Sequence, residues 1–425
     1  MAVVFVAAIA IGVPIPFAAG LATVIGLIMA DIPLTLIAQS AYTAFEPFPL
    51  TTIPLFILAG QLMEKGGMSD HLIAISQRLV GAYKGGLGLV TVVACMLFAA
   101  LSGSGPATTA AIGSITIPAM LRENYSPAFA GAVAAAAGAL GSMIPPSNLL
   151  IIYGLVTDES IPRLFLAGLI PGVMLGLLLL LVTYVLARRH GYGLLGDKFS
   201  WRPLLCALWD GKWAVFAPVI ILGGIYAGIF TPSEAAAVAV FYGLFVGLFV
   251  YKGLNWKEIY SALRFTAILI GTVLFILSSA KAFGQLVTLY DIPTAVGELL
   301  GVIKQYPTLV LLVIGVFYIL VGTWLESIPQ IIIFTAVLLP FVESIGIDPL
   351  LFGVFTVMTC EVGFLTPPIG VNLFVGSKIA GVSVERISLA VLPFLVPYLL
   401  MMVLLATYSE WVLYLPDLVF GTRVQ

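Results

Sequence analysis

Long apolar runs, separated by short polar breaks, follow one another along almost the whole chain. Many of them approach the roughly 20 residues that an α-helix needs to cross a bilayer. A membrane β-barrel would instead show shorter segments of alternating polarity, so the pattern predicts an all-α polytopic membrane protein. Residues 69–83 (SDHLIAISQRLVGAY) are amphipathic, which predicts a helix that lies along the membrane interface.

The runs divide the chain into two halves around a polar linker at residues 188–212. For the first half, 1–187, the pattern predicts helices at 2–13, 16–30, 50–66 and 162–187, a hairpin at 85–121 and a broken helix at 127–157. For the second half, 213–408, it predicts helices at 213–230, 234–251, 263–285 and 385–408, a weakly amphipathic stretch at 288–304, a hairpin at 307–342 and a broken helix at 352–380. Residues 409–425 are expected to form a tail, and Tyr408, Trp411 and Tyr414 at its start mark the membrane interface.

The two halves resemble each other in sequence. The segment GSMIPPSNLLIIYG (141–154) aligns without a gap with GFLTPPIGVNLFVG (363–376), and Pro118 aligns with Pro340 at the same offset of 222 residues. An internal repeat of this kind predicts two similar halves built around a shared site.

Basic residues suggest how the halves are oriented. Placing 188–212 in the cytoplasm leaves only four of the 18 Lys and Arg residues on the far side: Arg163, Lys281, Lys304 and Arg423. This follows the positive-inside rule and predicts inverted halves, with the first hairpin opening from the cytoplasm and the second from the opposite face.

Composition supports a membrane protein and excludes several other classes. Hydrophobic residues make up 61% of the chain and charged residues 9%, with a mean hydropathy of +1.16, whereas soluble domains have about a quarter charged residues. The net charge of −2 and the lack of a basic block give no sign of nucleic-acid binding. Cys95, Cys206 and Cys360 lie far apart, and no His, Cys and carboxylate cluster suggests catalysis or a cofactor. The N-terminus has no basic region and predicts a retained membrane segment.

Four breaks interrupt the apolar pattern, two in each half: SGSGPATT (102–109), MIPPSN (143–148), GTWLESIPQ (322–330) and LTPPIGVN (365–372). Non-helical backbone survives at membrane depth only where protein or a watery cavity supplies partners. Its carbonyl, hydroxyl and amide oxygens suit a small cation such as sodium, and the positive ends of half-helices suit a substrate carboxylate. The alternative is a set of proline kinks that only tilt the helices.

Three ionisable residues fall at expected membrane depth, where such groups are functional candidates: Lys281, Glu326 and Glu361. Glu326 lies at the tip of the second hairpin and either contacts substrate or caps amides of the hairpin. We hypothesise that Glu361 pairs with Lys281.

The segments FAALSGSGPATTAAIGSITIPAM (98–120) and IFTPSEAAAVAVFYGL (229–244), with the two Pro-Pro motifs, resemble the large membrane subunit of TRAP transporters (tripartite ATP-independent periplasmic transporters). The resemblance implies an elevator-type transporter in the bacterial inner membrane, with a scaffold and a mobile domain that carries two re-entrant hairpins. It further implies sodium-driven uptake of an organic acid, such as a C4-dicarboxylate or a sialic acid, with most similarity to the sialic-acid branch. The implied partners are a soluble periplasmic binding protein and a small four-helix membrane subunit.

The resemblance also suggests roles for individual residues. The first sodium site would use Ser102, Gly103, Ser104, Gly105, Pro145 and Asn148, and the second would use Gly322, Thr323, Thr366, Pro367 and Gly370. Substrate would lie between the hairpin tips, near Ser104, Pro106, Thr109, Ser147, Glu326, Ser327 and Asn372. A proton-coupled or other ion-coupled carrier independent of a binding protein, and an ion channel, remain alternatives.

Overall fold

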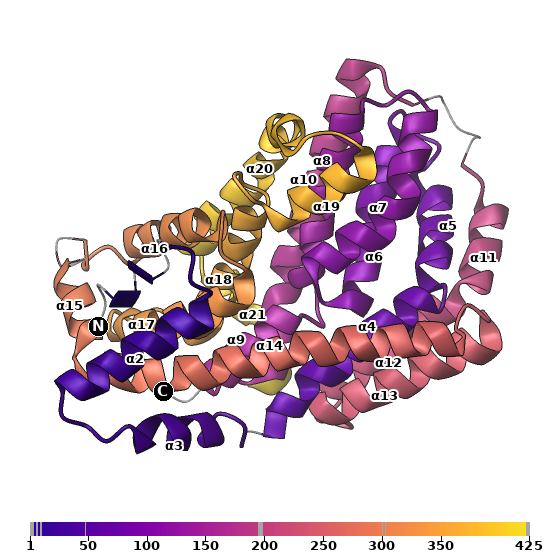
Figure 1. Ribbon diagram of the computed structural model, residues 1–425. Helices are drawn as coiled ribbons and strands as arrows, with labels where there is room; N and C mark the ends of the chain where they lie inside the picture. The colour runs from indigo at the N-terminus through magenta and orange to yellow at the C-terminus, as the bar shows by residue number, and fades with distance from the viewer. Residues whose placement is uncertain are drawn as a thin grey trace.

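The computed structural model describes residues 4–5, 7–8, 11–46, 48–193, 199–299, 301 and 303–421. Every regular element in these ranges is helical (Figure 1). The elements of the first half are α2 (Ile15–Met29), α3 (Thr35–Thr43), the 3-10 helix η1 (Phe48–Thr51), α4 (Thr52–Lys65), α5 (Met68–Val80), α6 (Gly86–Ser102), α7 (Gly105–Arg122), α8 (Pro127–Gly138), the 3-10 helix η2 (Ala139–Ser142), α9 (Asn148–Thr157) and α10 (Ile161–His190).

The second half continues in the same helical manner. Its elements are α11 (Trp201–Asp210), α12 (Lys212–Tyr226), α13 (Pro232–Phe245), the π-helix η3 (Val246–Val250), α14 (Trp256–Leu289), α15 (Ile292–Leu299), α16 (Pro307–Gly322), α17 (Ser327–Ser344), α18 (Pro349–Phe364), α19 (Val371–Ala380), α20 (Val384–Thr407) and α21 (Glu410–Phe420).

Five helices in the described part are long and apolar enough to cross a bilayer: α10, α13 with η3, α14, α17 and α20. Shorter apolar helices, including α6, α16, α18 and α19, accompany them. The expectation of an all-α polytopic membrane protein is therefore confirmed.

Local sequence signals explain where many helices begin. Ser126 caps α8 through the Phe129 amide at 3.3 Å, and Asn255 caps α14 through the Glu258 amide at 3.0 Å. Thr231 and Glu234 form a capping box at the start of α13. These side chains satisfy amides that have no partner within their own helix.

Both expected hairpins and both expected broken helices are present: α6–α7 and α16–α17 are the hairpins, and α8–α9 and α18–α19 are the broken helices. Several boundaries differ from the expectation, and α3 was not predicted. The linker 188–212 contains the amphipathic helix α11, the tail 409–425 contains α21, and α14 is longer than 263–285 because it starts at the Asn255 cap. The predicted helix at 2–13 and the position of Arg423 lie partly or wholly outside the described residues.

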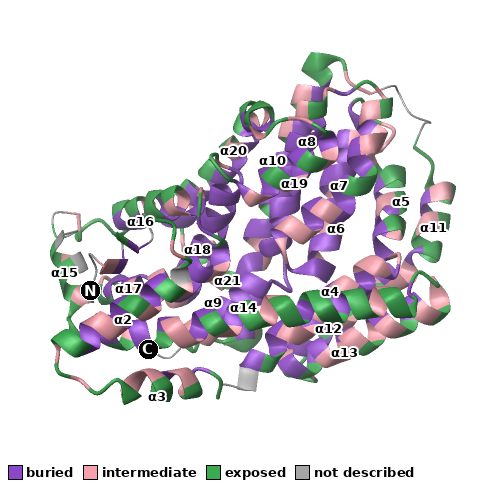
Figure 2. Cartoon of the chain, viewed as in Figure 1, coloured by how far each residue is buried: buried purple, intermediate pink, exposed green. Residues whose placement is uncertain are grey.

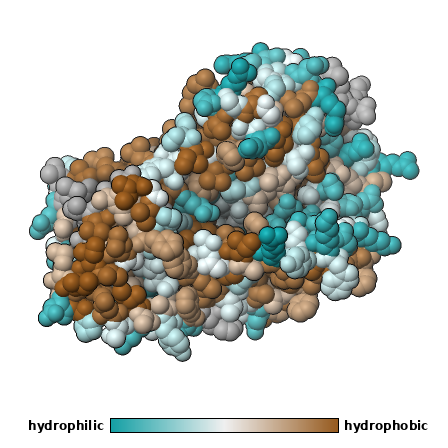
Figure 3. Space-filling view, in the orientation of Figure 1, coloured by the Kyte–Doolittle hydropathy of each residue, from teal (hydrophilic) through white to brown (hydrophobic). Residues whose placement is uncertain are grey.

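Some of the helices form a compact bundle, and the long helix α14 crosses the molecule beside it (Figure 1). Helices α6, α7, α8, α19 and α20 pack together, while α14 runs across the molecule against α2, α3, α4 and α17. Figure 2 shows α8 and α18 almost wholly buried and α14 largely exposed. Large apolar side chains are exposed on α14 and α2, for example Phe275 and Phe17. Figure 3 shows extensive hydrophobic areas on one face of the molecule. Such surface is expected where lipid replaces water as the solvent.

The C-terminal helix α21 is anchored to α10. The Arg163 guanidinium forms an ion pair with the Asp417 carboxylate and donates a second hydrogen bond to the Gly421 carbonyl at 2.8 Å. The Arg163 side chain is 12% exposed, so this contact is shielded from water more than a surface ion pair is.

We expect Asp417→Asn to lower the free energy of unfolding by about 1–3 kcal/mol, because it removes a charged acceptor from a largely buried arginine. Thermal unfolding in detergent, followed by tryptophan fluorescence, measures this. Glu410→Gln on the exposed start of the same helix is the matched control, and equal melting temperatures for the two variants would contradict the anchoring role.

Candidate transport site

The tip of the first hairpin is shaped by a glycine. Gly103 has a φ of 61°, a left-handed conformation that ends α6, and Ser104 is extended before α7 begins at Gly105. A Cβ atom at Gly103 would lie 2.7 Å from the Pro146 carbonyl oxygen, so both the backbone angle and the space favour glycine. The Ser102 and Thr108 hydroxyls, 2.6 Å apart, hydrogen-bond across the break.

This tip packs directly against the first broken helix. The Asn148 amide donates to the Gly103 carbonyl at 3.1 Å, and its side chain donates to the Ser102 carbonyl at 3.4 Å. Ser147 caps α9 by accepting from the Leu150 amide. The loops predicted to form the first sodium site therefore meet in space.

The second hairpin and the second broken helix meet in a similar way. The Ile369 amide donates to the Thr323 carbonyl at 3.1 Å, and the Thr366 hydroxyl donates to the Val362 carbonyl at 2.7 Å. Gly322 and Gly363 pack backbone to backbone, since a Cβ atom at Gly363 would lie 2.7 Å from the Gly322 Cα atom. The predicted second sodium loops, including Pro367 and Gly370, are thus also adjacent.

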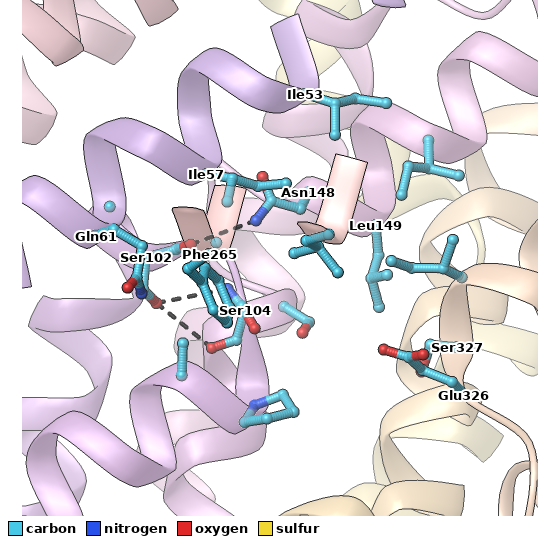
Figure 4. A pocket seen from close by; sticks show the side chains of 18 of the residues that line it. Ile53, Ile57, Gln61, Ser102, Ser104, Asn148, Leu149, Phe265, Glu326 and Ser327 are labelled. Atoms are coloured by element: carbon cyan, nitrogen blue, oxygen red, sulfur yellow. Dashed lines mark hydrogen bonds between the residues drawn. The ribbon is translucent and has the colours of Figure 1, made fainter. Parts of the chain in front are cut away.

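Both hairpin tips border one cavity of about 90 Å³ (Figure 4). A water molecule needs roughly 10–15 Å³ of such cavity volume, so the cavity has room for several water molecules. In Figure 4, Ser102, Ser104 and Asn148 lie on one side of the cavity, and Glu326 and Ser327 lie across from them. Glu361 and Phe364 of α18 also line it. Residues from both halves therefore share one site.

Some predicted site residues line this cavity and others do not; outside its lining are, from the predicted sodium loops, Gly105, Pro145, Gly322, Thr323, Thr366, Pro367 and Gly370. Those that line this cavity are Ser102, Gly103, Ser104, Pro106, Asn148, Glu326 and Ser327. Among the predicted substrate residues outside its lining, Thr109 donates to the Gly105 carbonyl at 3.0 Å, Ser147 is the cap described above, and Asn372 donates to Glu361. All three are buried, and their polar groups form hydrogen bonds at the helix ends around the cavity.

One wall of the cavity was not predicted. It comes from α4, with Ile53, Ile57, Gly60, Gln61 and Glu64, and from α14, with Phe265 and Leu269. Gln61 and Glu64, which share a hydrogen bond of 3.1 Å, are polar residues within an apolar helix and were a usable signal. The apolar residues gave none, because in sequence a side chain that faces a cavity looks like one that faces lipid.

The hypothesised pair between Lys281 and Glu361 is wrong. The Lys281 ammonium donates to the Thr43 carbonyl at 2.9 Å and lines a different cavity with Asp158. Glu361 is fully buried in α18.

Opposite charges meet at the cavity. The N-terminal ends of α7, α9 and α17 reach it through Ser104, Asn148 and Ser327, and such ends carry partial positive charge that favours anions. Glu326 and Glu361 carry carboxyl groups on the same lining, which favour cations. The arrangement suits an anion and a cation that bind together.

Comparison with known proteins decides the family. Residues 2–411 match the family described as Tripartite ATP-independent periplasmic transporter, DctM component. The chain belongs to this family. The resemblance drawn from the sequence is therefore confirmed.

Similar relatives carry different substrate names. The chain is 42% identical to the isethionate TRAP transporter permease protein DctMQ of Oleidesulfovibrio alaskensis, over 94% of this chain and 63% of that protein's length. It is 38% identical to the C4-dicarboxylate TRAP transporter large permease protein DctM of Pseudomonas aeruginosa, over 88% of this chain and 87% of the relative. It is 34% identical to the sialic acid TRAP transporter large permease protein SiaM of Vibrio cholerae, over 90% of each. Membership of the TRAP family thus does not select the sialic-acid branch.

A solved structure shares the fold. The crystal structure of the Alcanivorax borkumensis YdaH transporter, described as having an unusual topology, aligns with a TM-score of 0.65. The alignment covers 89% of this chain and 88% of that chain at 15% identity. At this identity the likeness concerns the fold of the TRAP permease alone.

We expect Gly103→Ala to destabilise the protein more than Gly191→Ala. Both glycines have a positive φ, 61° and 69°, but only Gly103 is crowded, and Gly191 has nothing within 4 Å of an added Cβ atom. Both variants therefore lose about 1–2 kcal/mol of stability from the backbone angle. Any further loss of stability in Gly103→Ala measures the close contact with Pro146. Thermal unfolding in detergent measures it, and equal losses would contradict tight packing of the tip on the broken helix.

Proposed function

We propose that the chain is the large membrane subunit of a sodium-coupled secondary transporter that takes up a small organic anion across the bacterial inner membrane. A soluble periplasmic binding protein delivers the anion, and a small four-helix membrane subunit completes the complex. The observation that carries this proposal is the cavity at which two hairpin tips, three helix N-termini and two carboxyl groups meet.

The polar lining supports an anionic substrate. Ser104, Asn148 and Ser327 offer hydroxyl and amide donors at helix N-termini, which is the usual environment for a carboxylate or sulfonate group. The substrates in the relatives' names, isethionate, C4-dicarboxylates and sialic acid, are all organic acids. We therefore propose that the substrate is a small organic acid with a carboxylate or sulfonate group.

The helix breaks support sodium as the coupling ion. Each hairpin tip sits on a broken helix through backbone contacts, Gly103 with Asn148 and Thr323 with Ile369. Carbonyl and hydroxyl oxygens are therefore concentrated at two loops, as a hard monovalent cation requires. Bound sodium would order the tips and offset the carboxylates before the anion enters.

In an elevator mechanism, the hairpins would move relative to helices α4 and α14. Gly60 of α4 lies so close to α6 that a Cβ atom there would be 3.1 Å from the Leu101 carbonyl oxygen. At Gly60 the backbone of α4 therefore packs directly against the backbone at the end of α6. We propose that the mobile domain slides along this contact.

Two alternatives remain distinct from this proposal. A proton-coupled or other ion-coupled carrier that needs no binding protein is favoured by Glu326 and Glu361 in the cavity lining. An ion channel would use the same breaks to line a pore.

Replacing sodium with potassium should abolish uptake. The chain is reconstituted with its small subunit and cognate binding protein in vesicles, and accumulation of radiolabelled isethionate, succinate and sialic acid is measured under an inward sodium gradient. We expect saturable uptake of at least one acid, reduced at least tenfold in potassium because the coupling ion is absent.

Each alternative has its own signature in these vesicles. Uptake that persists in potassium and follows a proton gradient would overturn sodium coupling, and uptake without the binding protein would overturn its role. Non-saturable flux without counterflow would indicate a channel.

A further inference from the structure

A fully buried carboxyl group forms part of the cavity lining. Glu361 belongs to the last turn of α18 and Asn372 to the first turn of α19, and both side chains are 0% exposed. The Asn372 side-chain nitrogen donates to Glu361 Oε2 at 3.4 Å. The other oxygens of the pair, Glu361 Oε1 and Asn372 Oδ1, have no hydrogen-bond partner among the described residues.

No positive side chain in the described part of the chain balances this carboxylate. The ion pairs found there join Lys65 to Glu258 and Arg163 to Asp417. A buried ion without a partner costs several kcal/mol, and a buried oxygen without a donor adds to that cost. A bound cation would supply the missing partner for both Glu361 Oε1 and Asn372 Oδ1, whose side chains already contact each other.

Helix ends of both signs meet at this spot. Glu361 lies at the C-terminal end of α18, which carries partial negative charge, whereas Gly105 begins α7 and Asn372 lies in the first turn of α19, where the charge is partly positive. The Ser142 hydroxyl accepts from the Gly105 amide at 2.9 Å. A Cβ atom at Gly105 would lie 2.7 Å from Glu361 Oε2, so only glycine at this position lets α7 pack directly against the carboxyl group.

We propose that Glu361 Oε1 and Asn372 Oδ1 bind a sodium ion at a position separate from the two hairpin loops. The inference deepens the proposed function and rests on its sodium coupling. A single carboxylate matches a monovalent ion, and no group of three His, Cys, Asp or Glu side chains that could hold a metal occurs among the described residues. Carboxylate and amide oxygens suit a hard cation.

This position lies where the two halves meet. Ala139 corresponds to Glu361 at the repeat offset of 222, and both residues approach Gly105, since a Cβ atom there would lie 3.4 Å from the Ala139 Cα atom and 2.7 Å from Glu361 Oε2. The first half therefore supplies a methyl group where the second supplies a carboxylate. The ion would join α7 and η2 of one half to α18 and α19 of the other, and it would screen the carboxylate from an anion in the same cavity.

The number of sodium ions that stabilise the protein tests this inference. The purified complex with the small subunit is unfolded thermally in detergent over a range of sodium chloride, with choline chloride holding the ionic strength constant. The dependence of stability on the logarithm of sodium concentration gives the number of ions bound. We expect Glu361→Gln, which keeps the shape and removes the charge, to bind one ion fewer than the wild type. Glu343→Gln on the exposed end of α17 should match the wild type.

The outcomes separate this inference from the proposed function. If Glu361→Gln keeps the wild-type number of sodium ions, the inference is overturned while sodium coupling stands. If Glu361→Gln instead removes only a pH dependence of unfolding, the occupant is a proton and the inference is again overturned. If the wild type shows no sodium dependence, sodium coupling itself fails.

A second variant covers the case in which Glu361→Gln does not fold. Asn372→Ala removes one ligand oxygen and keeps the carboxylate, and we expect it to raise the sodium concentration for half-maximal stabilisation about tenfold or more. An unchanged concentration would overturn the inference.

Discussion

Peptide groups in the middle of a bilayer have no water to bond, so each interruption of a helix must find its hydrogen-bond partners inside the protein. In this structure the interruptions are paired. The tip between α6 and α7 receives the Asn148 amide of the first broken helix, and the tip between α16 and α17 receives the Ile369 amide of the second. Because each break contributes to satisfying another, the hairpins and broken helices must lie next to each other. The shared cavity follows from that requirement.

The charges around the cavity have a related cause. Ending a helix inside the protein exposes a positive end where α7, α9 and α17 begin and a negative end where α18 stops. Anions and cations therefore find complementary positions a short distance apart. With Glu326 and Glu361 present, an anion alone would meet unfavourable charge, and a cation alone would leave the positive ends unused. This mutual dependence is the physical basis for the coupling that we propose.

Sequence predicted the helix breaks because glycine, proline and hydroxyl residues are unusual within apolar runs, and the two Pro-Pro motifs appear at a constant offset. Sequence could not predict the wall formed by α4 and α14. Apolar residues such as Ile57 and Phe265 are equally common facing lipid and facing a cavity, so their identity does not distinguish the two. The Lys281 hypothesis was wrong because both charges were assigned to membrane depth without information on which helices are neighbours. Helix α11 was missed because the linker was interpreted as polar, and α21 because the aromatic tail was interpreted only as marking the membrane interface; α3 was not predicted either.

The contact between Gly322 and Gly363 places two main chains so close that neither position has room for a side chain. Hairpin α16–α17 and helix α18 are therefore held at one fixed separation along this line, and they would be displaced as a single body. A larger residue at either glycine would separate both helices, so substitutions at the two positions are expected to arise jointly during evolution. Correlated change between residues 322 and 363 would be the trace of that geometry among related sequences.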